Sequence, residues 1–235
     1  MPQPFRFKQF SVNDDRCAQK VGTDSIVLGS WALANSVATI LDIGTGCGLL
    51  ALMLAQRFPK AQITAVEIDR PAYEQAADNF HHSPWAGRLS AVQTDIKDFR
   101  PDGVFDLIVC NPPYFQGGIA SMTEVRKIAR QDKQLTLVSL SESAARLLSP
   151  VGSFNVILPI DRTSELITAA KNNDLHPVRH CDVRPTSDTA AKRSLLEFQF
   201  QAAASVAYDK ITLEQSRHEY HSDYVSLARE FLLRM

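Results

Sequence analysis

Residues 41–52 read LDIGTGCGLLAL, and this stretch decides the fold. Residues 39–43 form an apolar, partly β-branched run, which predicts a buried strand. Three glycines come next at alternate positions, Gly44, Gly46 and Gly48, and a backbone without Cβ atoms turns tightly and lets a ligand approach. Apolar residues then recur at the spacing of a helix: Leu49, Leu50, Met53 and Leu54. The stretch therefore predicts a strand–turn–helix unit of an α/β protein, with a ligand at the turn.

An acidic residue, Asp42, lies at the end of the predicted strand, so the order is D-x-G-x-G-x-G. The dinucleotide fingerprint is G-x-G-x-x-G, and its acidic residue lies about 20 positions further on. A carboxylate beside the loop repels a phosphate and suits an amino group or another cationic centre. The order favours S-adenosylmethionine, which carries an ammonium and a sulfonium, over NAD. The alternative is a glycine-rich turn without a ligand.

Two further acids end predicted strands. Residues 62–68, QITAVEI, predict a second strand with Glu67 near its end, and residues 89–95, LSAVQTD, predict a third that ends at Asp95. The carboxyl ends of strands line the ligand crevice of an open α/β sheet. Glu67 occupies the place where ribose hydroxyls are bound, and Asp95 is a candidate acceptor for an adenine amino group. The alternative for Glu67 is a solvated, helix-capping role shared with Asp69.

The second informative stretch is residues 104–114, VFDLIVCNPPY. Its apolar run predicts a fourth strand, and Pro112 and Pro113 fix a rigid turn at the end of that strand. An exocyclic amine is a poor nucleophile, but the Asn111 side-chain carbonyl and the Pro112 backbone carbonyl can each accept one N–H and aim its lone pair at a methyl donor. Tyr114 offers an aromatic face for stacking a base, a contact worth roughly 1–3 kcal/mol. The alternative is a chance turn.

Two polar segments carry cations that suit RNA phosphates. Residues 116–133 predict a mobile, basic flap beside the NPPY turn, although a solvated helix face is an equal alternative. The candidate RNA contacts in that segment are Arg126, Lys127 and Arg130. A second polar loop spans residues 185–193, and its composition needs no ligand to explain it. The candidate contacts there are Arg184, Lys192 and Arg193.

The rest of the chain alternates between predicted helices and strands. A first helix is expected to begin with Thr23 or Asp24 as its N-cap, and a later one with Asp69 ahead of Pro71. Further helices are predicted at about 135–148 and 165–171, and further strands at 153–158, 180–184 and 195–200. A last helix is predicted from an apolar stripe: Tyr220, Tyr224, Leu227, Phe231 and Leu232.

Composition excludes several classes of protein. The chain has 235 residues, 45% hydrophobic and 22% charged, with a net charge of −1, which is typical of a soluble globular α/β protein. No apolar run approaches the roughly 20 residues of a membrane span, and the N-terminus lacks the apolar stretch of a signal peptide, so a cytoplasmic protein is expected. Its four cysteines show no C-x-x-C spacing, and adjacent His81 and His82 point in different directions, so no metal site is expected. We expect a monomer.

With both stretches placed, the sequence resembles class I S-adenosylmethionine-dependent methyltransferases of the NPPY, amino-methylating branch over about residues 20–160. More narrowly, it is similar to the bacterial tRNA(Val) adenine N6-methyltransferase family. That likeness rests on KVGTDSIVLGSWA at 20–32, LDIGTGCGLLALM at 41–53, NPPYF at 111–115 and the aromatic tail. Ser25 and Cys47 depart from the glycine and threonine expected in that family.

The resemblance implies a Rossmann-like, seven-stranded, mostly parallel sheet with helices on both faces. It implies one domain over residues 1–235, in which residues 1–38 cap the cofactor and 39–235 form the core. Residues 111–114, Asn111 to Tyr114, would hold the target amine. The resemblance assigns S-adenosylmethionine to Lys20, Thr23, Asp42, Gly44, Gly46, Gly48, Glu67, Ile68, Asp95, Ile96 and Asn111.

The implied reaction is an in-line methyl transfer to the N6 of a flipped adenine beside the anticodon of a tRNA. Base flipping is expected because the amine is out of reach in a stacked base, and positioning and desolvation would supply most of the rate. The rivals are a protein glutamine N5-methyltransferase and an rRNA guanine N2-methyltransferase. A rival from another class is a non-catalytic cofactor- or RNA-binding module.

Overall fold

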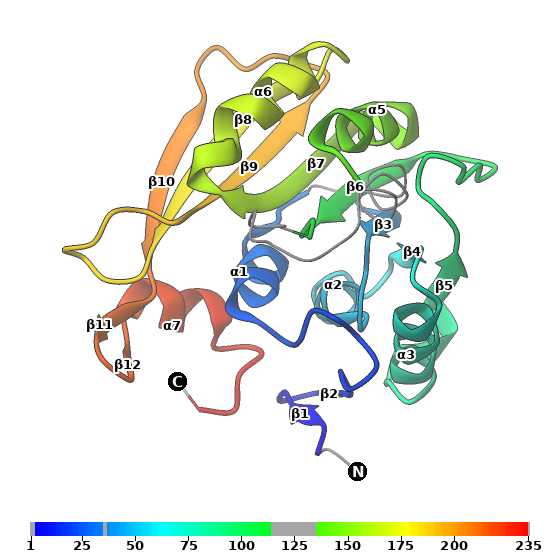
Figure 1. Ribbon diagram of the computed structural model, residues 1–235, viewed down its shortest axis with the longest axis horizontal. Coiled ribbons are helices and arrows are strands. Elements are labelled where there is room, and N and C mark those ends of the chain that lie inside the picture. Colours follow the sequence, from blue (N-terminus) through cyan, green and yellow to red (C-terminus); the bar gives the residue numbers. More distant parts are fainter. Residues whose placement is uncertain (1–2, 35–36, 114–134, 235) are drawn as a thin grey trace, which may run out of the picture.

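The computed structural model describes residues 3–34, 37–113 and 135–234. Its largest sheet has eight strands, with helices on both faces (Figure 1). In spatial order the strands are β10 (Ala207–Thr212), β8 (His176–Arg184), β9 (Arg193–Gln199), β7 (Leu148–Pro159), β6 (Phe105–Cys110), β3 (Thr39–Ile43), β4 (Gln62–Glu67) and β5 (Leu89–Gln93). Strands β3 to β7 are parallel, β9 is antiparallel to both β7 and β8, and β10 pairs parallel with β8.

The helices and short elements connect these strands. The helices are α1 (Thr23–Trp31), α2 (Leu49–Arg57), α3 (Arg70–His81), α5 (Leu137–Leu147), α6 (Thr163–Lys171) and α7 (Ser222–Ala228), with 3₁₀ turns η1 (Ala86–Arg88) and η2 (Ile160–Arg162). Two small antiparallel hairpins pair β1 (Phe5–Arg6) with β2 (Ser11–Val12) and β11 (Glu214–Ser216) with β12 (Glu219–Tyr220). Within the described ranges, no helix is long and apolar enough to cross a membrane.

The central strands are buried on both faces, which is why they read as continuous apolar runs. Successive side chains point to opposite faces, so Ile40 and Leu107 join a core with α1, α2, α3 and α7. Leu41 and Ile108 join a second core with α5 and α6 on the other face. The apolar runs in the sequence therefore fill two cores, and the ends of the strands remain for polar groups.

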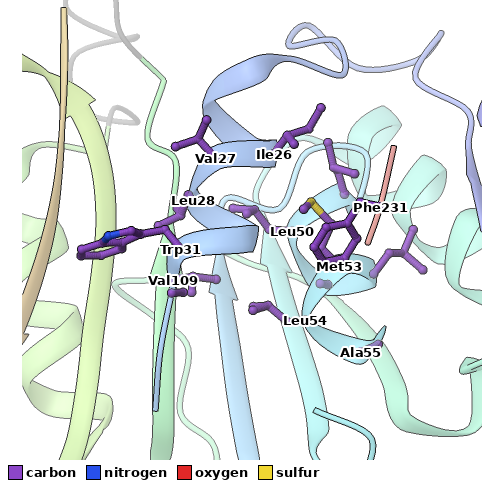
Figure 2. Packing of buried hydrophobic residues seen from close by; sticks show 14 of the residues in the cluster. Ile26, Val27, Leu28, Trp31, Leu50, Met53, Leu54, Ala55, Val109 and Phe231 are labelled. Carbon is purple, nitrogen blue, oxygen red and sulfur yellow. The ribbon is translucent and has the colours of Figure 1, made fainter. Parts of the chain in front are cut away.

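Helix α1 lies against α2, close to the centre of the first core (Figure 2). Leu50 and Met53 of α2 lie on the same side of α1 as Ile26 and Phe231, whereas Val27 points the other way. The helix approaches closely at Gly29, where an added Cβ would lie 2.8 Å from the Met53 sulfur. This packing fixes the first turn of α1 beside the carboxyl ends of β3 and β6.

The predicted count of seven strands is wrong, because the sheet has eight. The strand that was not predicted is β10. Its sequence, AYDKIT, does not alternate apolar and polar residues, and its first four residues are exposed. It lies at the edge of the sheet, so one side of its backbone pairs with β8 while its first four side chains stay in solvent. Edge strands need little apolar surface, which removes the signal on which strand prediction depends.

Three other predictions differ at element ends. The last helix ends at Ala228, so Tyr220 lies in β12, and Phe231 and Leu232 cover the core from the segment after the helix. Helix α1 begins at Thr23 with Gly22 as its N-cap, and it has no side-chain cap because glycine has no side chain; Asp24 pairs with Arg193 instead. Strand β7 begins at Leu148, directly after α5, and not at residue 153 as predicted. The prediction that Asp69 caps α3 is confirmed, since its carboxylate accepts from the Ala72 N–H.

Candidate active site

The carboxyl ends of β3, β4 and β6 meet at one edge of the sheet, because these strands are parallel neighbours. A pocket of about 340 Å³ opens there between the glycine loop and the N-terminal segment. Its walls include Lys20, Ser25, Gly44, Gly46, Cys47 and Asn111.

The glycine loop needs its glycines for two different reasons. Gly44, Gly46 and Gly48 have φ angles of 69°, 57° and 85°, in the region that residues with a Cβ rarely adopt. An added Cβ would meet nothing within 4 Å at Gly44 or Gly46, so the space beside them is open to a ligand. At Gly48, which caps α2, a Cβ would lie 2.5 Å from the Phe80 ring. The first two glycines therefore leave room for a ligand, and the third leaves room for α3.

Glu67 ties the loop to the end of β4. One carboxylate oxygen accepts the Gly46 N–H at 2.9 Å, and the other accepts the N–H groups of Ile68 and Asp69, each at 2.9 Å. The side chain is almost fully buried, which strengthens these charge-assisted bonds. Glu67 therefore fixes the position of the glycine loop relative to the end of β4. Its contact with a ribose stays a prediction.

Asp42 lies beneath the loop and is completely buried. One carboxylate oxygen accepts the Thr45 hydroxyl at 2.5 Å, and the other has no hydrogen-bond partner within the described residues. Burial raises the pKa of Asp42 to about 7, and the negative charge of Glu67 adds to the rise. Charge from both acids also raises the pKa of the buried Cys110 thiol, although burial itself is the larger cause. The two carboxylates give the site a negative potential when they are ionised, which suits a cationic ligand.

The remaining predicted cofactor residues lie along the same edge. Asp95 follows β5, where its carboxylate accepts the Lys97 N–H at 2.9 Å and pairs with the Lys97 ammonium at 3.2 Å. Ile68 is 46% exposed, whereas Ile96 is buried in the second core. Their contacts with a cofactor stay predictions.

Two predicted residues of the N-terminal segment lie on different sides of α1. Lys20 lines the pocket, and its ammonium contacts Asp14 through the backbone carbonyl and, at 3.9 Å, the carboxylate. Thr23 lies on the far side of the first turn of α1, in the wall of a second hollow. The structure thus brings Lys20, but not Thr23, to the rim of the glycine pocket.

Asn111 is a buried polar residue in the wall of the pocket. It follows β6, is 6% exposed, and its side-chain Nδ2 donates to the Ser25 hydroxyl at 2.9 Å. Its Oδ1 is buried and has no partner among the residues described. A buried acceptor without a partner costs free energy unless a ligand supplies the missing donor. Of its NPPY neighbours, Pro112 is buried and Pro113 is exposed, and Tyr114 lies outside the described residues.

The predicted RNA contacts fall into two groups. Arg126, Lys127 and Arg130 lie outside the described residues. The others gather where β8 ends and β9 begins, which is the same edge of the sheet as the glycine pocket. Lys192 is exposed, Arg184 is partly buried, and Arg193 forms an ion pair with Asp24 at 2.8 Å.

Sequence reasoning missed Ser25 and Cys47 as parts of the pocket wall. Ser25 is 86 residues from Asn111 in sequence, and no spacing rule links the two. The neighbouring Cys17 thiol lowers the pKa of the Cys47 thiol. The only sequence signal was their departure from the residues expected at positions 25 and 47.

Comparison with known proteins identifies the fold and the chemistry. A family model described as the methyltransferase small domain matches residues 17–158, which include the glycine loop and the NPPY turn. The chain belongs to this family. It is therefore a methyltransferase.

In the described ranges, no cluster of three or more histidines, cysteines and acids could hold a metal ion.

Relatives within the family match along the whole chain. A protein from Phocaeicola vulgatus named tRNA1(Val) (adenine(37)-N6)-methyltransferase is 45% identical, and the match covers 100% of both chains. Proteins of the same name from Flavobacterium psychrophilum and Tolumonas auensis are each 42% identical over 98% of this chain, covering 100% and 97% of their own lengths.

Solved structures share the fold at lower identity. A predicted O-methyltransferase from Agrobacterium tumefaciens superposes with a TM-score of 0.70 at 19% identity, covering 88% of this chain and 96% of its own. A SAM-dependent methyltransferase from Corynebacterium glutamicum gives a TM-score of 0.52 at 15% identity, covering 77% and 89%. The fold is that of class I S-adenosylmethionine-dependent methyltransferases.

Proposed function

We propose that this chain transfers a methyl group from S-adenosylmethionine to the N6 amine of an adenine in tRNA, at position 37 of tRNA1(Val). The full-length relatives carry that name. We further propose that it acts as a cytoplasmic monomer and needs no metal.

The observation that carries the proposal is the free acceptor on Asn111. Because Nδ2 is held by Ser25, the side-chain amide is oriented with Oδ1 available for a donor. An adenine N6 amine carries two N–H donors. With one N–H on Asn111 Oδ1 and the other on the Pro112 backbone carbonyl, the nitrogen lone pair points out of the ring plane. No residue then needs to remove a proton before the methyl group is transferred, and the methylated amine releases its extra proton to water afterwards.

The residues of the glycine pocket fit S-adenosylmethionine. Bound there, this cofactor supplies a methyl group activated by a sulfonium. Glu67 has carboxylate lone pairs for the ribose hydroxyls, and the negative potential from Asp42 and Glu67 favours the cofactor's positive charges. The open space beside Gly44 and Gly46 admits a close approach to the backbone. We assign the adenine end of the cofactor to Asp95 and Ile68, at the neighbouring strand ends.

RNA binding is assigned to the cationic groups at the end of β8 and the start of β9, and to Arg126, Lys127 and Arg130. Phosphate contacts fix the register of an RNA without reading its sequence. Tyr114 is assigned to stacking on the flipped adenine.

The test is methyl transfer from labelled S-adenosylmethionine to unmodified total tRNA, followed by digestion and nucleoside mass spectrometry. We expect a new N6-methyladenosine peak that is absent with the Asn111→Ala variant. Cofactor binding by calorimetry confirms that both proteins are folded. Transfer to protein glutamine or to rRNA guanine, with none to tRNA, would contradict the proposal, and an Asn111→Ala variant with full cellular function would favour a non-catalytic module.

A further inference from the structure

A second hollow lies on the opposite side of the first turn of α1 from the glycine pocket. It encloses about 430 Å³, part of it open to solvent, between α1, the end of β8, the start of β9 and the residue after β10. Val27 lines it and points away from the α2 side of α1 (Figure 2). Ser25, two residues earlier, faces the glycine pocket and touches Asn111. One helical turn therefore separates the two sites.

The walls of the hollow combine an apolar floor with a charged rim. The half-buried Pro185 and Leu213 provide the accessible apolar surface, whereas Val27 and Val183 are buried, with 0% and 3% exposure. On the rim, Arg193 and Asp24 are joined by their ion pair at 2.8 Å, so their charges offset each other. Because this ion pair leaves little net charge at that place, the hollow suits a flat, largely apolar group better than it suits an ion.

The charge that remains on the rim is positive. Lys192 lines the hollow, its side chain is exposed, and no residue in the described part of the chain pairs with its ammonium. Arg184 lies next to the wall residue Pro185, and its buried Nε has no hydrogen-bond partner among the described residues. An apolar floor beneath unpaired cations matches a nucleotide, whose base is flat and whose phosphate is anionic.

We propose that this hollow, the flanking-base pocket, receives the base of a nucleotide next to the methylated adenine, with its phosphate on Lys192. The inference rests on the proposed tRNA substrate and goes further, because it assigns a second base-binding site. A helix with its side chains is roughly 10–12 Å across, a separation that neighbouring nucleotides of one strand can bridge. Holding a neighbouring base on one side of α1 would help keep the adenine unstacked at Asn111 on the other.

The first arm of the test changes the RNA. Synthetic anticodon stem–loops carry an abasic nucleotide immediately before or immediately after the target adenine, and kcat/KM is measured against the intact stem–loop. We expect one of the two abasic RNAs to lose roughly tenfold in kcat/KM, the scale expected for losing the burial of one base. Equal kcat/KM values on all three RNAs would contradict the proposal that this hollow binds a neighbouring base. No transfer to the intact stem–loop or to whole tRNA would instead overturn the proposed function.

The second arm changes the protein. Pro185→Trp fills the flanking-base pocket and should make the enzyme treat the intact and the sensitive abasic RNA alike. Lys192→Glu, a surface change that leaves the core alone, should lower kcat/KM on RNA several-fold without changing the affinity for S-adenosylmethionine. Lys171→Glu is the matched control, because Lys171 is exposed at the end of α6, at the opposite edge of the sheet. Full discrimination retained by Pro185→Trp, or equal losses in both lysine variants, would overturn the assignment.

Discussion

The two halves of one sheet edge differ in charge and in burial. At the carboxyl ends of β3, β4 and β6 lie buried acceptors, Asp42, Glu67 and Asn111. At the ends of β8 and β9 lie the cations Arg184 and Lys192, which reach solvent. Both sets of residues lie at the same edge of the sheet. The acceptors are buried, whereas the cations reach water.

This difference matches two kinds of ligand. A small ligand with a ribose and a positive centre gains most from desolvated acceptors, because charge interactions strengthen away from water. A long polyanion is bound by exposed cations that release counterions. Helix α1 stands between the halves, so Ser25 touches the acceptor half while Asp24 pairs with Arg193 in the cationic half.

Removing the free acceptor should have the largest effect. Asn111→Ala is expected to lower methyl transfer by roughly 10²–10³-fold, the cost of losing one positioned hydrogen-bonding group at a reacting centre. The affinity for S-adenosylmethionine should change little, which calorimetry measures alongside labelled transfer. Asn172→Ala, at the far edge of the sheet, is the control. A residual rate within tenfold of wild type would show that other groups hold the amine.

The buried acid should make stability depend on pH. The pKa of Asp42 is raised from 3.8 to about 7 in the fold, so the folded protein keeps a proton that the unfolded chain releases near pH 4. The stabilisation is therefore complete below about pH 4 and is lost as the pH rises to 7. From pH 5 to 8, wild type should lose roughly 2 kcal/mol or more relative to Asp42→Asn, measured by urea unfolding. Asp102→Asn, an exposed change, is the control, and parallel pH curves for wild type and Asp42→Asn would refute the prediction.

Changing Glu67, the proposed ribose acceptor, should lower the affinity for the cofactor. Glu67→Gln keeps the shape but removes the charge that accepts the N–H groups of Gly46, Ile68 and Asp69. We expect roughly tenfold weaker binding of S-adenosylmethionine, since bonds to a charged acceptor are worth about 1.5–3 kcal/mol. Glu74→Gln on the surface of α3 is the matched control. Unchanged affinity in calorimetry would remove Glu67 from the cofactor site.

The contact between α1 and β6 should affect turnover more than binding. Ser25→Ala leaves Asn111 Nδ2 without its acceptor, so the amide is free to turn, and kcat should fall roughly fivefold, the scale of one hydrogen bond. The KM values for tRNA and cofactor should stay close to wild type. Ser25→Thr, which keeps the hydroxyl, should restore most of the rate, and Ser226→Ala is the control. A loss of cofactor affinity with kcat intact would show a structural role instead.

Removing one cation from the end of β8 should have the smallest effect of these substitutions. Arg184→Gln is expected to weaken tRNA binding about threefold and to lower the slope of log affinity against log salt by about 0.7–0.9, one phosphate contact. Filter binding over a salt series measures both quantities, with Lys171→Gln as the control. An unchanged slope would place Arg184 outside the RNA path.

The strands and helices around the glycine loop can be predicted from local sequence patterns. Strands β3, β4, β5 and β6 and helices α2 and α3 match the sequence predictions within a few residues, because apolar periodicity, the glycines and Pro71 act locally. The edge strand β10 and the short last helix do not, because exposed strands and residues such as Phe231 carry no periodic signal of their own.

The sequence alone determined the family and the methyltransferase class of this protein, because the glycine loop and the NPPY turn are local patterns within a dozen residues. The roles of the acids at the strand ends stay predictions from the same local patterns. Only the tertiary structure decided which of these groups are in contact. Ser25 meets Asn111 across 86 residues, Asp24 meets Arg193 across 169, and the flanking-base pocket forms between α1, β8 and β9. Such contacts depend on how α1 packs against α2 and β7, which is set by the whole core and not by any local stretch.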